Sequence, residues 1–252
     1  MEETERWLTT IREENAAFRA KTGAIRLTLF RVISCLLAIP RLLSKAVRGE
    51  GWAPSRHDHQ LPWLPLLPGL KAMPMRDVQD HPWTQGLRQA LPDIKEELAE
   101  AQRSFVLARY DSDLNPKRWT AYYFYLLGRP NRKHLAACPR TAELLRQLPH
   151  NSFHVCFSAI EPGGSLHPHS GPINGSLVAH LGLEGCAGAR VWVAGELAEY
   201  RDGEVVVFDD SFVHWVEHTG AQMRYTLMVT FWHPELTWLE RLFLKQVVRT
   251  AR

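Results

Sequence analysis

The sequence predicts a mainly β protein, an antiparallel sandwich or barrel with N-terminal and flanking α-helices. From residue 118 onward, short β-prone segments follow one another and are separated by turns rich in Gly, Pro and Asn. Strands at such regular spacing are typical of sandwiches and barrels. The 252 residues and 45% hydrophobic content suffice for one such domain with a helical arm appended.

Six segments have the composition of strands, namely 118–128, 153–160, 176–183, 189–195, 204–210 and 223–232. In the last segment, alternation places Arg224, Thr226 and Met228 on one face and Tyr225 and Leu227 on the other. The first face is the more polar of the two. We therefore expect it to line a water-accessible cavity inside the barrel.

Helices are predicted outside these strands, at 83–107, 138–149 and 235–252. Residues 1–48 are helical in pattern, and the proline-rich residues 49–82 indicate an irregular linker that wraps the domain surface. We expect three parts: a helical arm at 1–48, the linker at 49–82 and a domain at 83–252 whose core spans 118–234.

Residues 21–48 contain six basic residues and no acid, and their apolar run is interrupted by Arg31 and Arg41 and bent by Pro40. Such a segment is too short and too charged for a transmembrane span. Two interpretations stay open. The helix packs on the domain with its arginines in water, or it lies on a membrane surface as a basic amphipathic helix.

Composition indicates the cellular compartment of the protein and the classes of partner that it binds. The four cysteines are far apart and form no CxxC, which indicates free thiols in a reducing compartment. The N-terminus is charged and does not have the pattern of a secretory signal. We expect a cytoplasmic protein, with membrane contact through residues 21–48 as the open alternative. The net charge of +3 does not suggest nucleic acid as a partner.

The stretch "SLHPHSGPINGSLVAHLGL" contains His167, His169 and His180 but no acid, and "FDDSFVHW" places His214 further along the chain. Imidazole suits Fe(II), and non-haem Fe(II) oxygenases use two histidines and leave metal positions open. An α-keto acid cosubstrate needs a cation for its far carboxylate, and Arg224 has the planar fork for that pairing. These residues point to an iron site.

The motifs "HPHSGPIN…HLGL…GEVVVFDDSFVHWVEHTG…RYTLMVTFWHPEL" resemble the aspartyl/asparaginyl β-hydroxylase family of Fe(II)- and 2-oxoglutarate-dependent oxygenases. The resemblance runs from about Trp119 to Pro234. It implies a double-stranded β-helix, the jelly-roll or cupin-like barrel. It also implies Fe(II), 2-oxoglutarate and O2 as cofactor and cosubstrates, and makes 83–252 an oxygenase domain.

The resemblance also implies roles for individual residues. His169 and His214 match the two iron ligands, and Arg224 matches the arginine that binds the C5 carboxylate of 2-oxoglutarate. Three further residues match positions at the cosubstrate: His180, Ser158 and Trp119. One family position differs, because Val178 stands where some relatives carry an arginine.

The third metal position is unusual, because the common H-x-D/E motif here reads His169-Ser170-Gly171. The family also has glycine there, and the resemblance implies that water fills the position. Asp209 or Asp210 could instead supply a carboxylate, although acids beside such a loop more often cap turns or orient the ligand imidazole. In halogenating relatives a small residue leaves room for chloride.

The resemblance predicts a dioxygenase that hydroxylates an unactivated C–H bond of an aspartyl- or asparaginyl-type amino acid or peptide. Other substrates and roles remain open: a lipid or other small metabolite, halogenation at the open iron position, or a non-catalytic barrel scaffold. His167 is a candidate substrate contact, since it lies two residues before His169 and points the same way along an extended strand.

Overall fold

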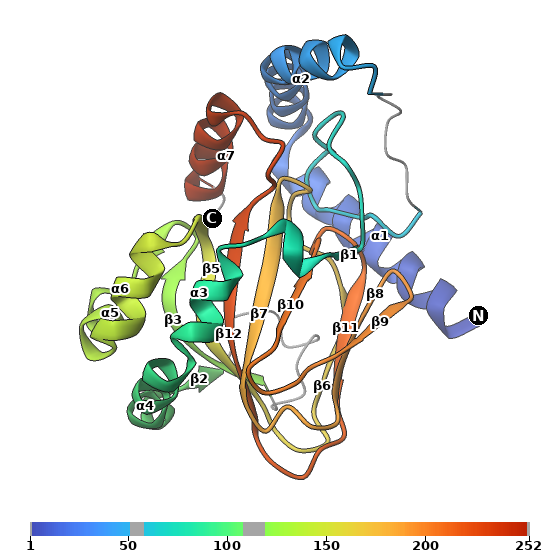
Figure 1. Cartoon of the computed structure of the whole chain (residues 1–252). Coiled ribbons are helices and arrows are strands. Elements are labelled where there is room, and N and C mark those ends of the chain that lie inside the picture. Colours follow the sequence, from blue (N-terminus) through green and yellow to red (C-terminus); the bar gives the residue numbers. More distant parts are fainter. Residues whose placement is uncertain (1, 51–57, 108–118, 251–252) are drawn as a thin grey trace.

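The computed structural model describes residues 2–50, 58–107 and 119–250 and contains two antiparallel sheets surrounded by helices (Figure 1). The larger sheet has the order β1 (Met75–Arg76), β10 (Val205–Phe208), β7 (Ser176–Glu184), β12 (Arg224–Trp232), β5 (His150–Ile160), β3 (Trp119–Leu126) and β2 (Val106–Leu107), and β4 (Arg129–Pro130) pairs with β3. The smaller sheet has the order β6 (Ser165–His169), β11 (His214–His218), β8 (Ala189–Val193) and β9 (Glu196–Glu199). The predicted double-stranded β-helix with N-terminal and flanking helices is confirmed.

All six predicted strand segments coincide with strands β3, β5, β7, β8, β10 and β12. The sequence did not predict β6 and β11, the edge strand and its neighbour in the smaller sheet. Each has only five residues, and β6 contains Pro168 and lies close to glycines at both ends. Short strands with these residues lack the continuous alternation that identifies a strand in sequence.

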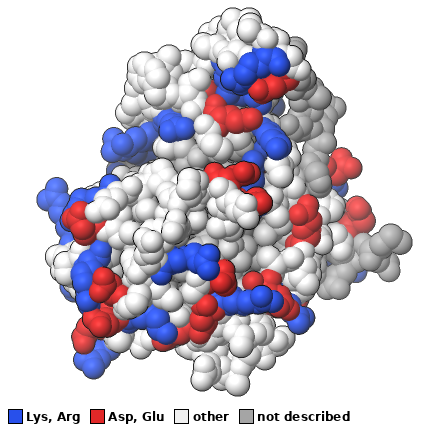
Figure 2. All heavy atoms as spheres, in the orientation of Figure 1, with Lys and Arg blue, Asp and Glu red and all other residues white. Residues whose placement is uncertain are grey.

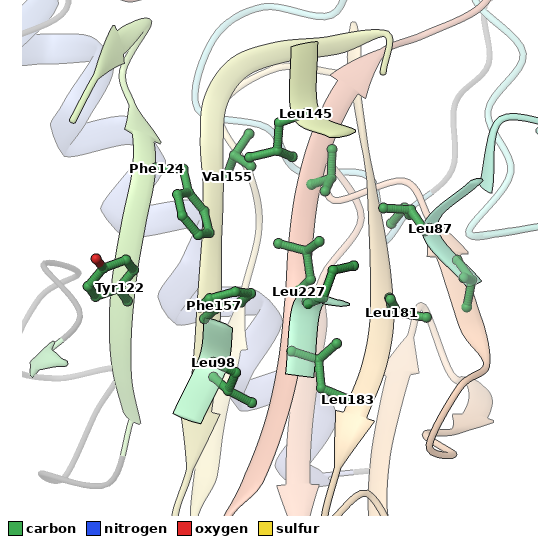
Figure 3. Packing of buried hydrophobic residues seen from close by; sticks show 14 of the residues in the cluster. Leu87, Leu98, Tyr122, Phe124, Leu145, Val155, Phe157, Leu181, Leu183 and Leu227 are labelled. Atoms are coloured by element: carbon green, nitrogen blue, oxygen red, sulfur yellow. The ribbon is translucent and has the colours of Figure 1, made fainter. Parts of the chain in front are cut away.

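The outer face of the larger sheet is covered by α3 (Thr84–Gln89), α4 (Leu91–Ala101), α5 (Arg132–Ala137) and α6 (Pro139–Gln147). Figure 3 shows Leu181 and Leu227 of the sheet with Leu87, Leu98 and Leu145 of the helices in one buried cluster. The predicted helix at 83–107 is not continuous. It divides at Ala90, and beyond Ala101 it gives way to the 3-10 turn η2 (Gln102–Ser104) and to β2.

The inner face of the larger sheet packs against the smaller sheet and carries the cavity-lining residues. In β7, Leu177 and Leu181 join the outer cluster, whereas Val178 belongs to the cluster between the sheets. In β12, Leu227 joins the outer cluster and Met228 the inner one. The strand alternation predicted for 223–232 is thus confirmed.

The N-terminal arm forms two consecutive helices, α1 (Glu2–Thr22) and α2 (Ala24–Val47), joined at Gly23 with a φ of 86°. The described part of the linker, residues 58–82, contains η1 (Val78–Asp80) and buries Leu64, Leu67 and Leu70 in one cluster with Phe30 of α2. The C-terminal helix α7 (Trp238–Thr250) lies next to α2 (Figure 1). The division into arm, linker and oxygenase domain stays a prediction.

The expectation that the arginines of α2 lie in water is wrong for Arg41. Its side chain faces the domain, and its guanidinium Nη2 lies 2.7 Å from the Glu240 carboxylate of α7. The residue is only 6% exposed. Glu240 comes from the far end of the chain, so no local sequence pattern shows that Arg41 has a buried partner.

Leu227→Ala is expected to lower the free energy of unfolding by about 2–5 kcal/mol, because Leu227 is fully buried between sheet and helices. Leu197→Ala is the matched control. Leu197 is 52% exposed, so this change is expected to cost less than about 0.5 kcal/mol. Urea unfolding of both variants tests the assignment of the core, and equal losses would contradict it.

Candidate functional site

A cavity of about 640 Å³ lies between the two sheets and helix α1. Its floor is formed by inward-facing residues of the barrel, and its opposite wall by one side of α1. All six residues predicted for the site line this cavity: Trp119, Ser158, His169, His180, His214 and Arg224.

His169 and His214 are directly opposite one another across the β6–β11 pair. Their ring centroids are 4.2 Å apart. Each Nδ1–H donates to a backbone carbonyl two residues earlier: His169 to His167 at 2.8 Å, and His214 to Phe212 at 2.8 Å. This hydrogen bond fixes the tautomer and leaves each Nε2 with a free lone pair, as in metal-ligating histidines.

Both imidazoles are neutral at ordinary pH. Burial lowers the pKa of His169, and burial together with the nearby His169 lowers the pKa of His214 well below its usual range. Two neutral imidazoles on adjacent strands are a suitable donor pair for a divalent metal such as Fe(II). Within the described residues, no group of three or more His, Cys, Asp or Glu side chains forms a metal-binding cluster.

The space beside Gly171 is filled by the carboxylate of Asp210, which comes from the loop between β10 and β11. A Cβ atom at Gly171 would lie 2.6 Å from the Asp210 Cγ. The Asp210 carboxyl group lines the cavity, and burial raises its pKa well above the usual range. Among the described residues its buried Oδ1 has no hydrogen-bond partner. A carboxyl group from a distant loop thus lies where the usual H-x-D/E acid would begin.

Asp209, the neighbouring acid, is held within the turn by hydrogen bonds instead. Its Oδ1 accepts hydrogen bonds from the Ser211 N–H at 3.0 Å and the Ser211 hydroxyl at 2.6 Å, which caps the turn. Burial raises its pKa to about 7. The expectation that an acid here caps a turn is confirmed for Asp209. The imidazoles of His169 and His214 are oriented by backbone carbonyls rather than by either acid.

Arg224 is almost fully buried at 1% exposure at the deep end of the cavity. Its guanidinium lies 4.3 Å above the Tyr200 ring centroid, and its Nη2 is 3.5 Å from His180 Nδ1. No carboxylate lies within ion-pair distance among the described residues, and the guanidinium Nε has no hydrogen-bond partner there. An ion pair between Arg224 and Asp209 or Asp210, the structural alternative, does not form.

His180 and Tyr200 form the polar surroundings of this guanidinium. The Tyr200 hydroxyl is 2.9 Å from His180 Nδ1, and the two rings are stacked. Burial and the charge of Arg224 lower the pKa of His180 well below its usual range, so this imidazole is neutral. Sequence reasoning missed Tyr200, because a single tyrosine at the end of a short strand carries no signal of its own.

Ser158 and Trp119 meet on the same side of the cavity, where the Trp119 Nε1–H donates to the Ser158 hydroxyl at 2.9 Å. His167 is exposed and lies on the cavity wall near the mouth, in keeping with its prediction as a substrate contact. Both observations agree with the predicted locations, while the roles themselves stay predictions.

Helix α1 contributes a wall of the cavity that the sequence did not predict. Trp7, Ile11 and Phe18 supply apolar surface there, and Glu14 and Lys21 supply charge. The helix is fixed by Asn15, which donates to the Leu61 carbonyl at 2.7 Å, and by a tilted Trp7–Trp215 contact at 5.6 Å. Its contact partners lie far along the chain, so periodicity alone does not reveal the contact.

The fold and the cavity define the class: a jelly-roll protein with a histidine pair and a buried arginine in one pocket. The model of the family described as aspartyl/asparaginyl beta-hydroxylase matches residues 88–234. The match covers more than half of the chain. The chain belongs to this family.

Three known proteins illustrate the relationship. The human aspartyl/asparaginyl beta-hydroxylase is 35% identical over 136 residues, which are 50% of this chain and 18% of that protein. The ornithine lipid ester-linked acyl 2-hydroxylase of Rhizobium tropici is 27% identical over 172 residues, 64% of this chain and 61% of its own length. A prolyl hydroxylase structure from Trichoplax adhaerens is 10% identical, covers 62% of this chain and 81% of its own, and has a TM-score of 0.43. The chain therefore spans less than two thirds of the length of the human hydroxylase and of the Rhizobium tropici acyl 2-hydroxylase.

Gly171→Asp is expected to destabilise the protein by about 1–3 kcal/mol, because the new side chain meets the Asp210 carboxyl group in a buried space. The double variant G171D/D210G removes that contact and is expected to recover most of the loss. Gly86→Asp, at a glycine with nothing within 4 Å of its Cβ position, is the control. Thermal unfolding measures all three, and a fully stable G171D variant would contradict the close approach.

Proposed function

We propose that the protein is an Fe(II)- and 2-oxoglutarate-dependent dioxygenase that hydroxylates an unactivated C–H bond. Membership of a hydroxylase family supports an oxygenase in general. The observation that carries the proposal is the cavity in which a neutral histidine pair and a buried arginine lie together.

His169 and His214 would hold the metal through their Nε2 atoms, since both Nδ1–H groups are engaged by backbone carbonyls. The Asp210 carboxyl group lines the same cavity against Gly171 and would be available as a further oxygen donor. When bound, Fe(II) with 2-oxoglutarate would supply the activation of O2 and the insertion of one oxygen atom into the substrate. The protein residues position the reactants and exclude water.

Arg224 supports the cosubstrate assignment through an energetic argument. A guanidinium almost free of solvent and without a carboxylate partner is costly, because burial removes the hydration of its charge. A dicarboxylate cosubstrate would provide the missing charge. Its distal carboxylate would pair with Arg224, and Tyr200 and His180 hold the guanidinium in place. Ser158 and Trp119 would form the side of the same subsite.

Hydroxylation is favoured over halogenation by the position of Asp210. A chloride ligand needs an open space beside a small residue, and here a carboxyl group fills the space against Gly171. A non-catalytic scaffold is also disfavoured. Such a protein would need neither the pair of neutral imidazoles nor a buried arginine that has no acid partner among the described residues.

The family supports an aspartyl- or asparaginyl-type amino acid or peptide as the substrate. A lipid substrate is the second candidate, and a specific observation favours it. The α1 wall of the cavity carries three large apolar side chains, Trp7, Ile11 and Phe18, which would accommodate an acyl chain beside the polar residues of the same wall. The similarity to an acyl 2-hydroxylase from Rhizobium tropici agrees with this candidate.

His169→Ala and His214→Ala are each expected to lower the conversion of 2-oxoglutarate to succinate by more than about a hundredfold, because each removes a metal donor. His134→Ala is the matched control. The His134 Nδ1 also bonds a backbone carbonyl, at 2.7 Å, but this residue lies outside the cavity. Equilibrium dialysis with Fe(II) measures metal binding independently of turnover. Full metal binding by both cavity variants would refute the assignment.

Arg224→Ala is expected to raise the KM for 2-oxoglutarate by about 10- to 100-fold, the loss expected for a charge-assisted hydrogen-bonded pair. Arg190→Ala, at an exposed arginine of β8, is the control and should leave KM unchanged. Steady-state kinetics at saturating Fe(II) decide the point. An unchanged KM in the Arg224 variant contradicts its proposed role.

The substrate class is decided by mass spectrometry of cell extracts incubated with the protein, Fe(II) and 2-oxoglutarate. Hydroxylation adds one oxygen atom, so the products appear as a mass increase of about 16 Da in either the peptide or the lipid fraction. The family default predicts the peptide or amino-acid fraction. A shift confined to lipids would establish the second candidate instead.

A further inference from the structure

Helix α2 carries an apolar stripe along its outer side. Eight large aliphatic residues recur every three or four positions, which places them on one side of the helix. Each is between 36% and 88% exposed: Ile25, Leu29, Val32, Ile33, Leu36, Ile39, Leu43 and Val47. Single exposed leucines are common, but a continuous stripe of this length marks a surface that contacts something apolar.

The opposite side of α2 faces the domain and is partly charged. Its buried residues include Ser34, Arg41 and Lys45. Arg41 pairs with Glu240 at 2.7 Å, and Lys45 pairs with Glu235 at 2.9 Å. A surface helix of a soluble protein normally directs its apolar side inward. The polarity of α2 is reversed, because charged groups fix it to the domain and aliphatic groups point outward.

Helix α7 extends the apolar surface beside α2. The two helices lie side by side (Figure 1). The ring centroids of Phe30 and Phe243 between them are 5.6 Å apart. At the start of α7, Trp238 is 71% exposed, and Leu239 and Leu242 are 39% and 50% exposed. Tryptophan is enriched at the boundary between lipid tails and headgroups, where its ring is amphipathic.

Exposed basic residues flank this surface on both helices. α2 contains no acidic residue, and its Arg26 and Arg31 are exposed. On α7, Lys245 and Arg249 are exposed as well. Figure 2 shows uncharged atoms at the upper tip of the molecule, over α2, with both basic and acidic atoms directly beneath them. Basic groups flanking an apolar stripe complement the anionic headgroups of a lipid surface.

We propose that the outer stripe of α2, together with Trp238, Leu239 and Leu242, docks on the surface of a lipid bilayer that contains anionic lipids. A second copy of the chain is a poorer occupant, because pairing two such surfaces would bring the basic residues of both copies together. The docking does not depend on the proposed chemistry of the cavity.

The helix lies along the bilayer surface rather than across it. By length and composition, and contrary to the expectation that this segment is too short and too charged, α2 is the one helix among the described residues that could span a membrane. Spanning, however, would separate Arg41 and Lys45 from Glu240 and Glu235 and place their charges in hydrocarbon. With these ion pairs intact, only the outer stripe can enter the lipid, as in interfacial amphipathic helices.

Docking in this orientation brings the cavity wall close to the lipid. α1 continues into α2 at Gly23, and Phe18 and Lys21, near this junction, line the cavity. Substrates associated with the bilayer would thus meet the α1 side of the cavity first.

Cys35 provides a native probe of docking. It is on α2 and is the one exposed cysteine of the four, all of which are described. The full chain is labelled there with a polarity-sensitive maleimide fluorophore and titrated with vesicles of phosphatidylcholine, with or without phosphatidylglycerol. We expect a blue shift of the emission, with tighter binding to the anionic vesicles and weaker binding at high salt.

The double variant L36E/L43E is expected to weaken vesicle binding by more than about tenfold, because two aliphatic contacts with lipid are lost. Leu197→Glu, at a 52% exposed leucine of β9 away from the stripe, is the control and should bind normally. Circular dichroism and thermal unfolding establish that all variants remain folded, as expected for substitutions at exposed positions.

Three outcomes would overturn the proposal. The first is the absence of any emission change with the wild-type chain, and the second is unaltered vesicle binding by L36E/L43E. The third is a wild-type dimer in light scattering without lipid that becomes monomeric in L36E/L43E, since this would assign the stripe to a second copy. None of these outcomes bears on metal or 2-oxoglutarate binding, which the cavity variants test separately.

Discussion

The site depends on the antiparallel pairing of two short strands, β6 and β11. Their register sets His169 opposite His214, although the two residues are far apart in sequence. Directly paired residues on one face of a sheet have their Cβ atoms about 5 Å apart, close enough for two imidazoles to share one ligand. A register shift of one residue would turn one histidine away from the cavity and remove the pair.

The larger sheet completes the site through strand alternation. β12 directs Arg224 and Met228 into the cavity and Leu227 into the helix-covered core, and β7 does the same with His180. The hydrophobic cluster beneath α3, α4 and α6 thus fixes the face on which the polar residues stand. Within the part of the chain that the structure describes, the Arg224 guanidinium has no acid partner, and Tyr200 and His180 lie against it.

The sequence alone predicts much of this arrangement, because alternation and turn residues mark the long strands, and motif spacing links His169, His214 and Arg224. The features that the sequence did not predict were missed for physical reasons. β6 and β11 are too short for alternation to identify them. Tyr200 and Asp210 acquire their surroundings only when strands distant in sequence meet. The α1 wall depends on contacts with Leu61 and Trp215, which periodicity cannot show. For α2, the pattern shows two faces but not that the charged face is the buried one, since Glu235 and Glu240 lie far along the chain.

The central claim is that one cavity binds Fe(II) through the histidine pair and 2-oxoglutarate through Arg224. Anaerobic absorption spectroscopy tests it most directly, because 2-oxoglutarate chelated to Fe(II) gives a metal-to-ligand charge-transfer band without turnover or substrate. We expect this band in the wild-type protein, its loss in the His214→Ala variant, and a requirement for much more 2-oxoglutarate in the Arg224→Ala variant. A band of undiminished intensity at the same 2-oxoglutarate concentration in both variants would contradict it.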